Sequence, residues 1–140
     1  MEQANNSMTQ GVHHVGLTIP SLSQTLSFFE NTLGFKKLGE KPDYPAAFVS
    51  DGVTMVTLWQ AKPHKNCEPT GFNRHQNIGL HHLALSVASK SALYELHSRL
   101  QEAPDVTIEF APEAIGSAGA EHMMCLIPGG PRVEFRAEAE

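Results

Sequence analysis

The sequence has no long apolar run, no cluster of basic residues and only two cysteines. No apolar run approaches the roughly 20 residues that span a bilayer, which argues against a membrane partner. The formal net charge is −5 and lysine and arginine are scattered, which argues against a nucleic-acid partner. Cys67 and Cys125 are too few for a disulfide framework, and residues 1–10 do not resemble a signal peptide. We therefore expect a soluble, cytoplasmic protein.

The overall amino-acid composition is typical of a packed globular domain. Hydrophobic residues make up 41% and charged residues 18% of the 140 positions. These fractions favour a folded core over disorder. A chain of this length is expected to form one domain, or two small copies of a motif that share one core.

One stretch of the sequence occurs twice. Residues Gly11–Pro20 read GVHHVGLTIP, and residues Gly79–Ala88, about half a chain length later, read GLHHLALSVA. Each copy is followed by a helical pattern, which indicates an internal duplication. We expect a single domain over residues 1–140, composed of a first module at about 11–60, a linker at 61–78 and a second module at about 79–137.

The first module reads as a strand, a helix and three further strands. Residues 12–19 alternate with the period of a strand, and a capping-box pattern at Ser21 begins a helix. The Asp51-Gly52 dipeptide predicts a two-residue hairpin turn, which would pair Phe48 with Met55. The strands expected in this module are 12–19, 35–41, 46–50 and 53–60.

The second module repeats this order. Ser89 can cap a helix, and a turn at Pro128–Pro131 is expected to pair Cys125 with Glu134 in the closing hairpin. Two βαβββ modules with eight strands and two helices make one α+β domain. The strands expected in this module are 80–87, 106–111, 121–127 and 132–136.

Candidate metal ligands lie on the strand faces opposite the apolar ones. His14 and His82 have small or hydroxylated neighbours on their own face. Alternation along the last strand places Glu134 on the same side, and Thr57 holds the matching position of the first module. We therefore expect His14, His82 and Glu134 to project into one cavity. Two imidazoles and a carboxylate can hold a divalent metal ion and leave positions open for water, substrate or oxygen.

The other histidines have simpler interpretations. A lone histidine is more often a hydrogen-bonded core or turn residue than a ligand, so the metal assignment depends on the duplication. His13 and His81 fall on the helix-facing side of their strands and are interpreted as packing residues. His122 reaches the rim of the pocket only if the strand register shifts by one residue.

Three features of the sequence resemble the vicinal oxygen chelate superfamily. They are the paired H-H-[VL]-[GA]-L-[TS]-[IV] strands, the helix end SFFENTLGF and the closing PGGPRVEF. The superfamily includes glyoxalase I, extradiol dioxygenases, fosfomycin-resistance transferases, methylmalonyl-CoA epimerase and bleomycin-binding proteins. The resemblance implies two βαβββ modules that form an eight-stranded, cup-shaped mixed sheet with two helices outside. It also implies a homodimer, with metal ligands at His14, Thr57, His82 and Glu134.

Thr57 departs from the pattern of glyoxalase I and the epimerases, which resemble one another in having a carboxylate or amide there. A threonine hydroxyl is a poor metal ligand and cannot act as a base near neutral pH. The remaining set of His14, His82 and Glu134 is similar to that of the iron-dependent extradiol dioxygenases and the manganese-dependent fosfomycin transferases. We expect iron, manganese, zinc or nickel as the metal, with Glu134 as the candidate catalytic residue.

The expected registers also predict the wall of the cavity. Apolar, aromatic and sulfur-containing side chains suit a small substrate with a hydrophobic body and one chelating polar end. Either Arg132 or Arg136 is expected to anchor an anionic substrate group or to hold Glu134 ionised, although solvated edge charges are the simplest interpretation of this pair. Plain core packing is the alternative for Trp59 and Phe48, and a small apolar filler for Cys125. The pocket residues predicted are Phe48, Met55, Thr57, Trp59, Met123, Cys125 and Arg136.

Two classes of function remain open. The first is a metal-dependent enzyme, either a glyoxalase-like lyase or isomerase or an extradiol-type dioxygenase. Thr57 argues against the former, and the short single domain argues against the latter. The second is a non-catalytic binding or resistance protein of the bleomycin-binding type. Such proteins usually lack the ligand residues, so the presence of His14, His82 and Glu134 favours the enzyme.

Overall fold

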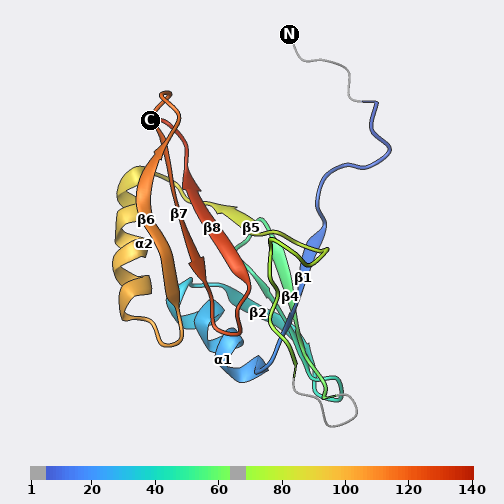
Figure 1. The fold of residues 1–140 in the computed structure, drawn as a ribbon. Coiled ribbons are helices and arrows are strands. Elements are labelled where there is room, and N and C mark those ends of the chain that lie inside the picture. The colour runs from blue at the N-terminus through green and yellow to red at the C-terminus, as the bar shows by residue number, and fades with distance from the viewer. Residues whose placement is uncertain (1–5, 64–68) are drawn as a thin grey trace.

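The computed structural model describes residues 6–63 and 69–140, whose eight strands are divided between two four-stranded sheets (Figure 1). The first sheet has the order β1-β4-β3-β2 and the second the order β5-β8-β7-β6. In each sheet one parallel pair, β1 with β4 or β5 with β8, accompanies antiparallel pairs. The strands are β1 (His14–Ile19), β2 (Lys36–Lys41), β3 (Ala46–Ser50), β4 (Met55–Gln60), β5 (Leu83–Ser86), β6 (Thr107–Ile115), β7 (Ala120–Leu126) and β8 (Arg132–Ala137).

The identical strand order of the two sheets confirms the predicted α+β fold of two βαβββ modules. The chain folds as a pair of open sheets, one for each module, without closing into a barrel. The expected cup is thus divided into two halves, and no backbone ladder joins β1 to β5 among the residues that the structure describes.

The two helices begin where the sequence predicts. The Ser21 hydroxyl accepts a hydrogen bond from the Gln24 backbone N–H at the start of α1 (Leu22–Ser27). Ser89 does the same for α2 (Lys90–Glu102), with the Ala92 N–H as donor. Such caps satisfy backbone donors that the first helical turn leaves free. The first helix continues as the π-helical turn η1 (Phe28–Thr32). No helix in the described ranges is long and apolar enough to cross a membrane.

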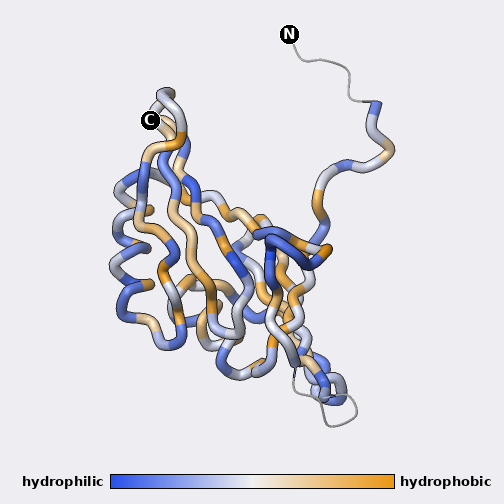
Figure 2. Tube along the Cα trace, viewed as in Figure 1, coloured by the Kyte–Doolittle hydropathy of each residue, from blue (hydrophilic) through white to orange (hydrophobic). Residues whose placement is uncertain are grey.

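Each helix packs against the sheet of its own module, and the buried apolar side chains of both modules form one core. Figure 1 shows α2 along one face of the second sheet, and Figure 2 shows hydrophobic and hydrophilic residues alternating along its strands. This alternation leaves the opposite face of each sheet for other chemistry. The core comprises Leu17, Ile19, Phe28, Phe29, Phe35, Val49, Val56, Leu58, Leu85, Leu93, Leu100, Met123, Cys125, Ile127, Val133, Phe135 and Ala137.

A buried hydrogen bond joins the two modules. The Thr25 hydroxyl on α1 donates to the Pro128 carbonyl in the β7–β8 turn at 2.8 Å. In the same turn Gly129 has φ +99°, and a Cβ built there would lie 3.0 Å from Pro20 and 3.1 Å from Ile19. The start of the first helix therefore fits closely against the turn of the second module, as Figure 1 also shows.

The predicted register of the first hairpin is wrong by two residues. Phe48 pairs with Thr57, and not with Met55. The turn is longer than two residues because the Asp51 carboxylate accepts hydrogen bonds from the backbone N–H groups of Val53 and Thr54. Since side chains alternate with a period of two, this shift keeps the predicted residues on a common face.

The predicted register of the second hairpin is wrong by one residue, which has a larger effect. Glu134 pairs with Met124, and not with Cys125. The Ile127 N–H donates to the Pro131 carbonyl, so the turn contains three residues where four were expected. A shift of one residue exchanges the two faces of a strand. Met123 and Cys125 therefore lie in the helix-facing core, outside the predicted pocket wall.

We expect Thr25→Val to destabilise the fold by about 1–3 kcal/mol, because it removes the donor to a buried carbonyl at the contact between the modules. Urea denaturation, followed by circular dichroism, measures the change in the free energy of unfolding. Thr107→Val, at an exposed position of β6, is the matched control and should change it little. Equal effects of the two substitutions would show that the hydrogen bond of Thr25 does not stabilise this contact.

Candidate functional site

Thr57 and Glu134 lie on the sheet faces that point away from the helices. Along the parallel strand pairs, Gly16 lies beside Thr57 and Ala84 lies beside Glu134. The predicted equivalence of Thr57 and Glu134 in the two modules is thus confirmed. A Cβ on Gly16 would approach the Thr57 hydroxyl oxygen to 3.1 Å, so glycine leaves space there that a larger residue would fill.

On the second sheet a nearly buried carboxylate lies between two imidazoles. Glu134 Oε1 is 3.2 Å from His82 Nε2, and Glu134 Oε2 is 3.3 Å from His122 Nδ1. The Glu134 side chain is only 11% exposed. His122 Nε2 lies 3.8 Å from Glu113 Oε1 at the outer side of this cluster. The one-residue register shift puts His122 on the same face as Glu134. With the correct turn length, the sequence alone would have predicted this position of His122.

His82 also contacts the histidine before it. His81 Nδ1 lies 2.8 Å from His82 Nδ1 and 3.4 Å from Arg132 Nη1. The prediction that His81 packs beneath the helices is wrong, because its side chain is exposed on the side of Arg132. Partial desolvation and the positive charge of Arg132 lower the pKa of His81.

Arg132 is itself held by an acidic residue on β6. Its Nη2 and Nε lie 2.6 Å and 3.1 Å from the two carboxylate oxygens of Glu109. Arg74 contacts the same carboxylate at 3.2 Å. The hydrogen bond from Arg132 lowers the pKa of Glu109, so this carboxylate stays ionised near neutral pH. Sequence reasoning missed Glu109, because the contact spans two strands of the sheet.

On the first sheet, His13 and His14 repeat the contact of the second pair, with their Nδ1 atoms 2.9 Å apart. Both side chains are exposed, so the prediction that His13 is a packing residue is also wrong. Among residues 6–63 and 69–140, no group of three histidine, cysteine, aspartate or glutamate side chains is arranged to hold a metal ion. The trio of His14, His82 and Glu134 therefore stays a prediction.

An aromatic wall stands on the same face as Thr57. Trp59 packs edge-on against Tyr44 with ring centroids 4.8 Å apart, and tilted against Phe48 at 5.8 Å. The Trp59 indole N–H donates to the Thr57 hydroxyl oxygen at 2.8 Å. Lys41 Nζ lies 5.7 Å from the Trp59 ring centroid, so a positive charge borders the wall. Met55, next to this group in register, is half-buried.

On the second sheet the wall has a different composition from the one predicted. Met124 is buried opposite Glu134, and the Phe110 ring lies 5.0 Å from that of His122. Cys125 lies in the core, where burial raises the pKa of its thiol to about 12, as expected for an apolar filler. Arg136 shares the face of Glu134 and donates to Glu138 at 2.8 Å, as expected for an edge charge.

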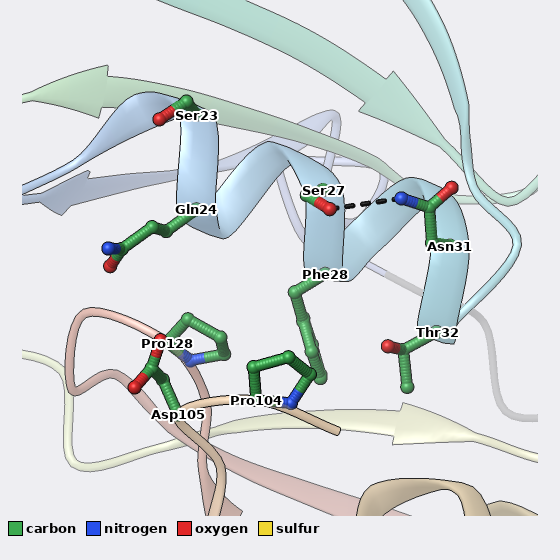
Figure 3. Close-up of a pocket in the computed structure, with 9 residues that line it drawn as sticks. All are labelled: Ser23, Gln24, Ser27, Phe28, Asn31, Thr32, Pro104, Asp105 and Pro128. Atoms are coloured by element: carbon green, nitrogen blue, oxygen red, sulfur yellow. Dashed lines mark hydrogen bonds between the residues drawn. The ribbon is translucent and has the colours of Figure 1, made fainter. Parts of the chain in front are cut away.

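A separate cleft of about 440 Å³ lies beside α1 (Figure 3). Hydroxyl and amide side chains of α1 and η1 line one side of it, and two prolines and an aspartate line the other. None of the predicted site residues borders this cleft, so its geometry does not bear on the metal prediction. The lining residues are Ser23, Gln24, Ser27, Phe28, Asn31, Thr32, Pro104, Asp105 and Pro128.

Comparison with protein families agrees with this arrangement of two modules. The family model described as the glyoxalase/bleomycin resistance protein/dioxygenase superfamily matches residues 11–135. The chain belongs to this superfamily. No curated protein matches the chain at a significant level.

Solved structures of similar fold include proteins with different names. A glyoxylase/bleomycin resistance protein/dioxygenase domain from Frankia sp. EAN1pec has a TM-score of 0.79 at 22% identity, covering 94% of each chain. A lactoylglutathione lyase from Agrobacterium tumefaciens has a TM-score of 0.68 at 18% identity, covering 94% of this chain and 96% of that one. A fosfomycin resistance protein from Listeria monocytogenes has a TM-score of 0.69 at 14% identity, with the same coverage. At these identities the likeness concerns the fold.

We expect the thiol of Cys125 to be unreactive in the folded protein, because burial keeps it protonated and inaccessible. In a Cys67→Ser variant, where Cys125 is the only thiol, labelling with a thiol-specific reagent at pH 8 should proceed at least about 100-fold more slowly in buffer than in denaturant. Rapid labelling in buffer would mean that the β7 register places Cys125 on the open face.

Proposed function

We propose that this chain is a metal-dependent enzyme of the glyoxalase/dioxygenase type, which binds a small oxygen-bearing substrate on a divalent metal ion held by His14, His82 and Glu134. The observation that carries the proposal is the 3.2 Å approach of His82 Nε2 to Glu134 Oε1 on an open sheet face. A carboxylate that is nearly withdrawn from water is costly unless hydrogen bonds or a positive charge compensate it.

The donor set fits a first-row divalent ion. Imidazole nitrogen and carboxylate oxygen suit iron, manganese, zinc and nickel, and three protein ligands leave positions open for a substrate. Ala84, beside Glu134, keeps the space in front of the carboxylate free of a large side chain. When bound, the metal would supply a Lewis acid that polarises a substrate oxygen.

The first sheet would position the rest of the substrate. The aromatic wall of Tyr44, Phe48 and Trp59 suits a planar or apolar body. Lys41 over the Trp59 ring favours a substrate with an anionic group near that body. A small anionic compound with vicinal oxygens has both features.

Thr57 narrows the reaction type. Its oxygen already accepts the indole N–H of Trp59, and a hydroxyl is not ionised near neutral pH. The first module therefore offers no base at the position equivalent to Glu134, and proton abstraction of the glyoxalase I type lacks its usual group. We favour ring cleavage or addition at a metal-bound substrate over isomerisation by proton transfer.

We also propose that the site is completed between two copies of the chain. His14 belongs to the first sheet, whereas Glu134 belongs to the second and His82 directly precedes its strand β5, and the described part of one chain holds no three-ligand group. The apolar residues Val12 and Leu80, beside the two His-His pairs, are exposed and would be covered in a dimer. Two-fold symmetry would then pair His14 of one subunit with the second sheet of the other, twice.

A second candidate function is the non-catalytic binding of an aromatic ligand. It is favoured by the aromatic wall together with the absence, within the described ranges of one chain, of a complete ligand set. Such a protein would bind small aromatic compounds without metal. Metal content therefore separates the two functions.

We expect the protein to bind about one divalent ion per chain after reconstitution, measured by elemental analysis of dialysed samples. His82→Ala and Glu134→Ala should each weaken binding by more than about 100-fold, since loss of a ligand exceeds the effect of changing its outer partners. His97→Ala, on α2, is the matched control and should bind like the wild type. A wild type that stays metal-free in iron, manganese, zinc and nickel would overturn the proposal.

Mixing two defective variants tests whether a second copy completes the site. His14→Ala and His82→Ala should each bind little metal alone. After unfolding and joint refolding, half of the dimers are expected to be mixed and to contain one intact site, which restores about a quarter of the wild-type capacity. A dimer whose mixed sample binds no more metal than its parents would place all three ligands within one chain.

The absence of a base at Thr57 leads to an expectation for turnover. The metal-loaded protein should act on catechols or fosfomycin and be at least about 100-fold slower on the methylglyoxal–glutathione hemithioacetal, because general-base catalysis contributes about that much or more. Thr57→Glu should raise the hemithioacetal rate, and Thr57→Gln is its uncharged control. Efficient hemithioacetal turnover by the wild type would refute our interpretation of Thr57.

A further inference from the structure

A chain of polar contacts leads from Glu109 to the imidazole of His82. Glu109 accepts two hydrogen bonds from Arg132, and Arg132 Nη1 lies 3.4 Å from His81 Nδ1. His81 Nδ1 in turn lies 2.8 Å from His82 Nδ1. The far nitrogen of that ring, His82 Nε2, faces Glu134.

The chemistry of arginine sets the direction of these hydrogen bonds. A guanidinium group carries only donors and keeps its proton in proteins. His81 Nδ1 must therefore be the acceptor of the contact with Arg132, and the proton of the neutral His81 ring is on Nε2. The same His81 Nδ1 also faces His82 Nδ1, so its single lone pair is shared between Arg132 at 3.4 Å and His82 at 2.8 Å, and the proton of the second contact belongs to His82.

The tautomer of His82 follows from this order. A neutral His82 that donates through Nδ1–H has a lone pair on Nε2, which is the atom directed at Glu134. Two acceptors, a ring nitrogen and a carboxylate oxygen, then lie 3.2 Å apart. A metal ion between them, or a proton on either atom, removes their repulsion. The nitrogen that a metal requires is thus presented by the ring before any metal binds.

We propose that Glu109, Arg132 and His81 are positioning residues that fix the Nδ1–H tautomer and the orientation of His82, so that its Nε2 is ready to bind a metal ion. The role of the metal rests on the function proposed above, whereas the tautomer is a property of the protein alone. Outer hydrogen bonds of this kind fix ring orientation and raise ligand basicity in metal sites.

The first module provides an internal comparison. His13 and His14 make the same Nδ1 to Nδ1 contact at 2.9 Å. Arg132 lies two residues before Glu134. In the first module the equivalent residue is Met55, which lies two residues before Thr57 and pairs in register with His14. Methionine has no donor, so no side chain at this position fixes the direction of the hydrogen bond between His13 and His14. We infer that only the second module fixes its tautomer through this position.

The test is the ¹⁵N spectrum of the histidine rings in the metal-free, full-length protein, with the His82 signals assigned by His82→Gln. We expect the Nδ1–H form for His82 in the wild type and a shift toward a mixture of both tautomers in Arg132→Met and His81→Leu. Arg136→Met removes an equal charge from the same strand face without touching His81, and is the matched control. A His82 ring with its proton on Nε2 in the wild type would overturn the inference, as would equal spectra for wild type and Arg132→Met.

A second measurement uses Zn²⁺ alone, titrated against a competing chelator. His81→Leu and Arg132→Met should weaken Zn²⁺ binding by about 10- to 100-fold. His81→Asn should recover most of the affinity, since its amide oxygen can accept the His82 proton from the place of Nδ1. Weakened binding that His81→Asn does not recover would count against a hydrogen-bonding role. If the wild type binds no Zn²⁺, the proposed metal site fails, while the ring spectra still decide the tautomer.

Discussion

The near-burial of the Glu134 carboxylate is the constraint on which the open face of the second sheet depends. Burying a carboxylate requires compensation by hydrogen bonds or positive charge, and the nearest groups are the imidazoles of His82 and His122. His122 Nδ1 has no partner in hydrogen-bonding geometry among the described residues, although Glu134 is 3.3 Å away. The cluster therefore places two imidazole nitrogens beside one carboxylate, and one of these nitrogens has no hydrogen-bond partner among the described residues. Such a group of nitrogen and oxygen atoms is able to receive a cation, and Ala84 beside Glu134 leaves space for one.

The length of one short turn determines which residues of β7 lie beside Glu134. Pro128–Gly130 closes the β7–β8 hairpin with three residues, and this length places Met124 and His122 on the open face and Cys125 in the core. The same turn contacts the first module, through the Thr25 hydroxyl and the close approach of Gly129 to Ile19. Register and module packing are thus coupled, because a turn of different length would change both the face of β7 and the contact with α1. A hairpin that is fixed from both sides can hold a costly buried carboxylate in one position.

Much of the fold follows from the sequence because its signals are local. The duplicated His-His stretches, the caps at Ser21 and Ser89 and the strand periodicity each depend on a few neighbouring residues, and the structure confirms the elements they predict. The equivalence of Thr57 and Glu134 was also predictable, since it depends only on the repeat. Turn geometry was not, because Asp51 lengthens one hairpin through its side chain and the paired glycines shorten another. Contacts such as Glu109 with Arg132 join distant strands, and alternation along one strand cannot reveal them.

The two modules share one strand order, but the side chains on their open faces differ in chemistry. The first face has His14, the Thr57 hydroxyl, which already accepts a hydrogen bond from Trp59, and an aromatic wall. The second face has the Glu134 carboxylate and the His81 imidazole, which Arg132 contacts. Neither face alone contains both a complete ligand set and an apolar wall for a substrate body. The function that we propose therefore requires that the two kinds of face meet. Since β1 and β5 belong to separate sheets within the described chain, the simplest arrangement that brings such faces together is the symmetric pairing of two copies.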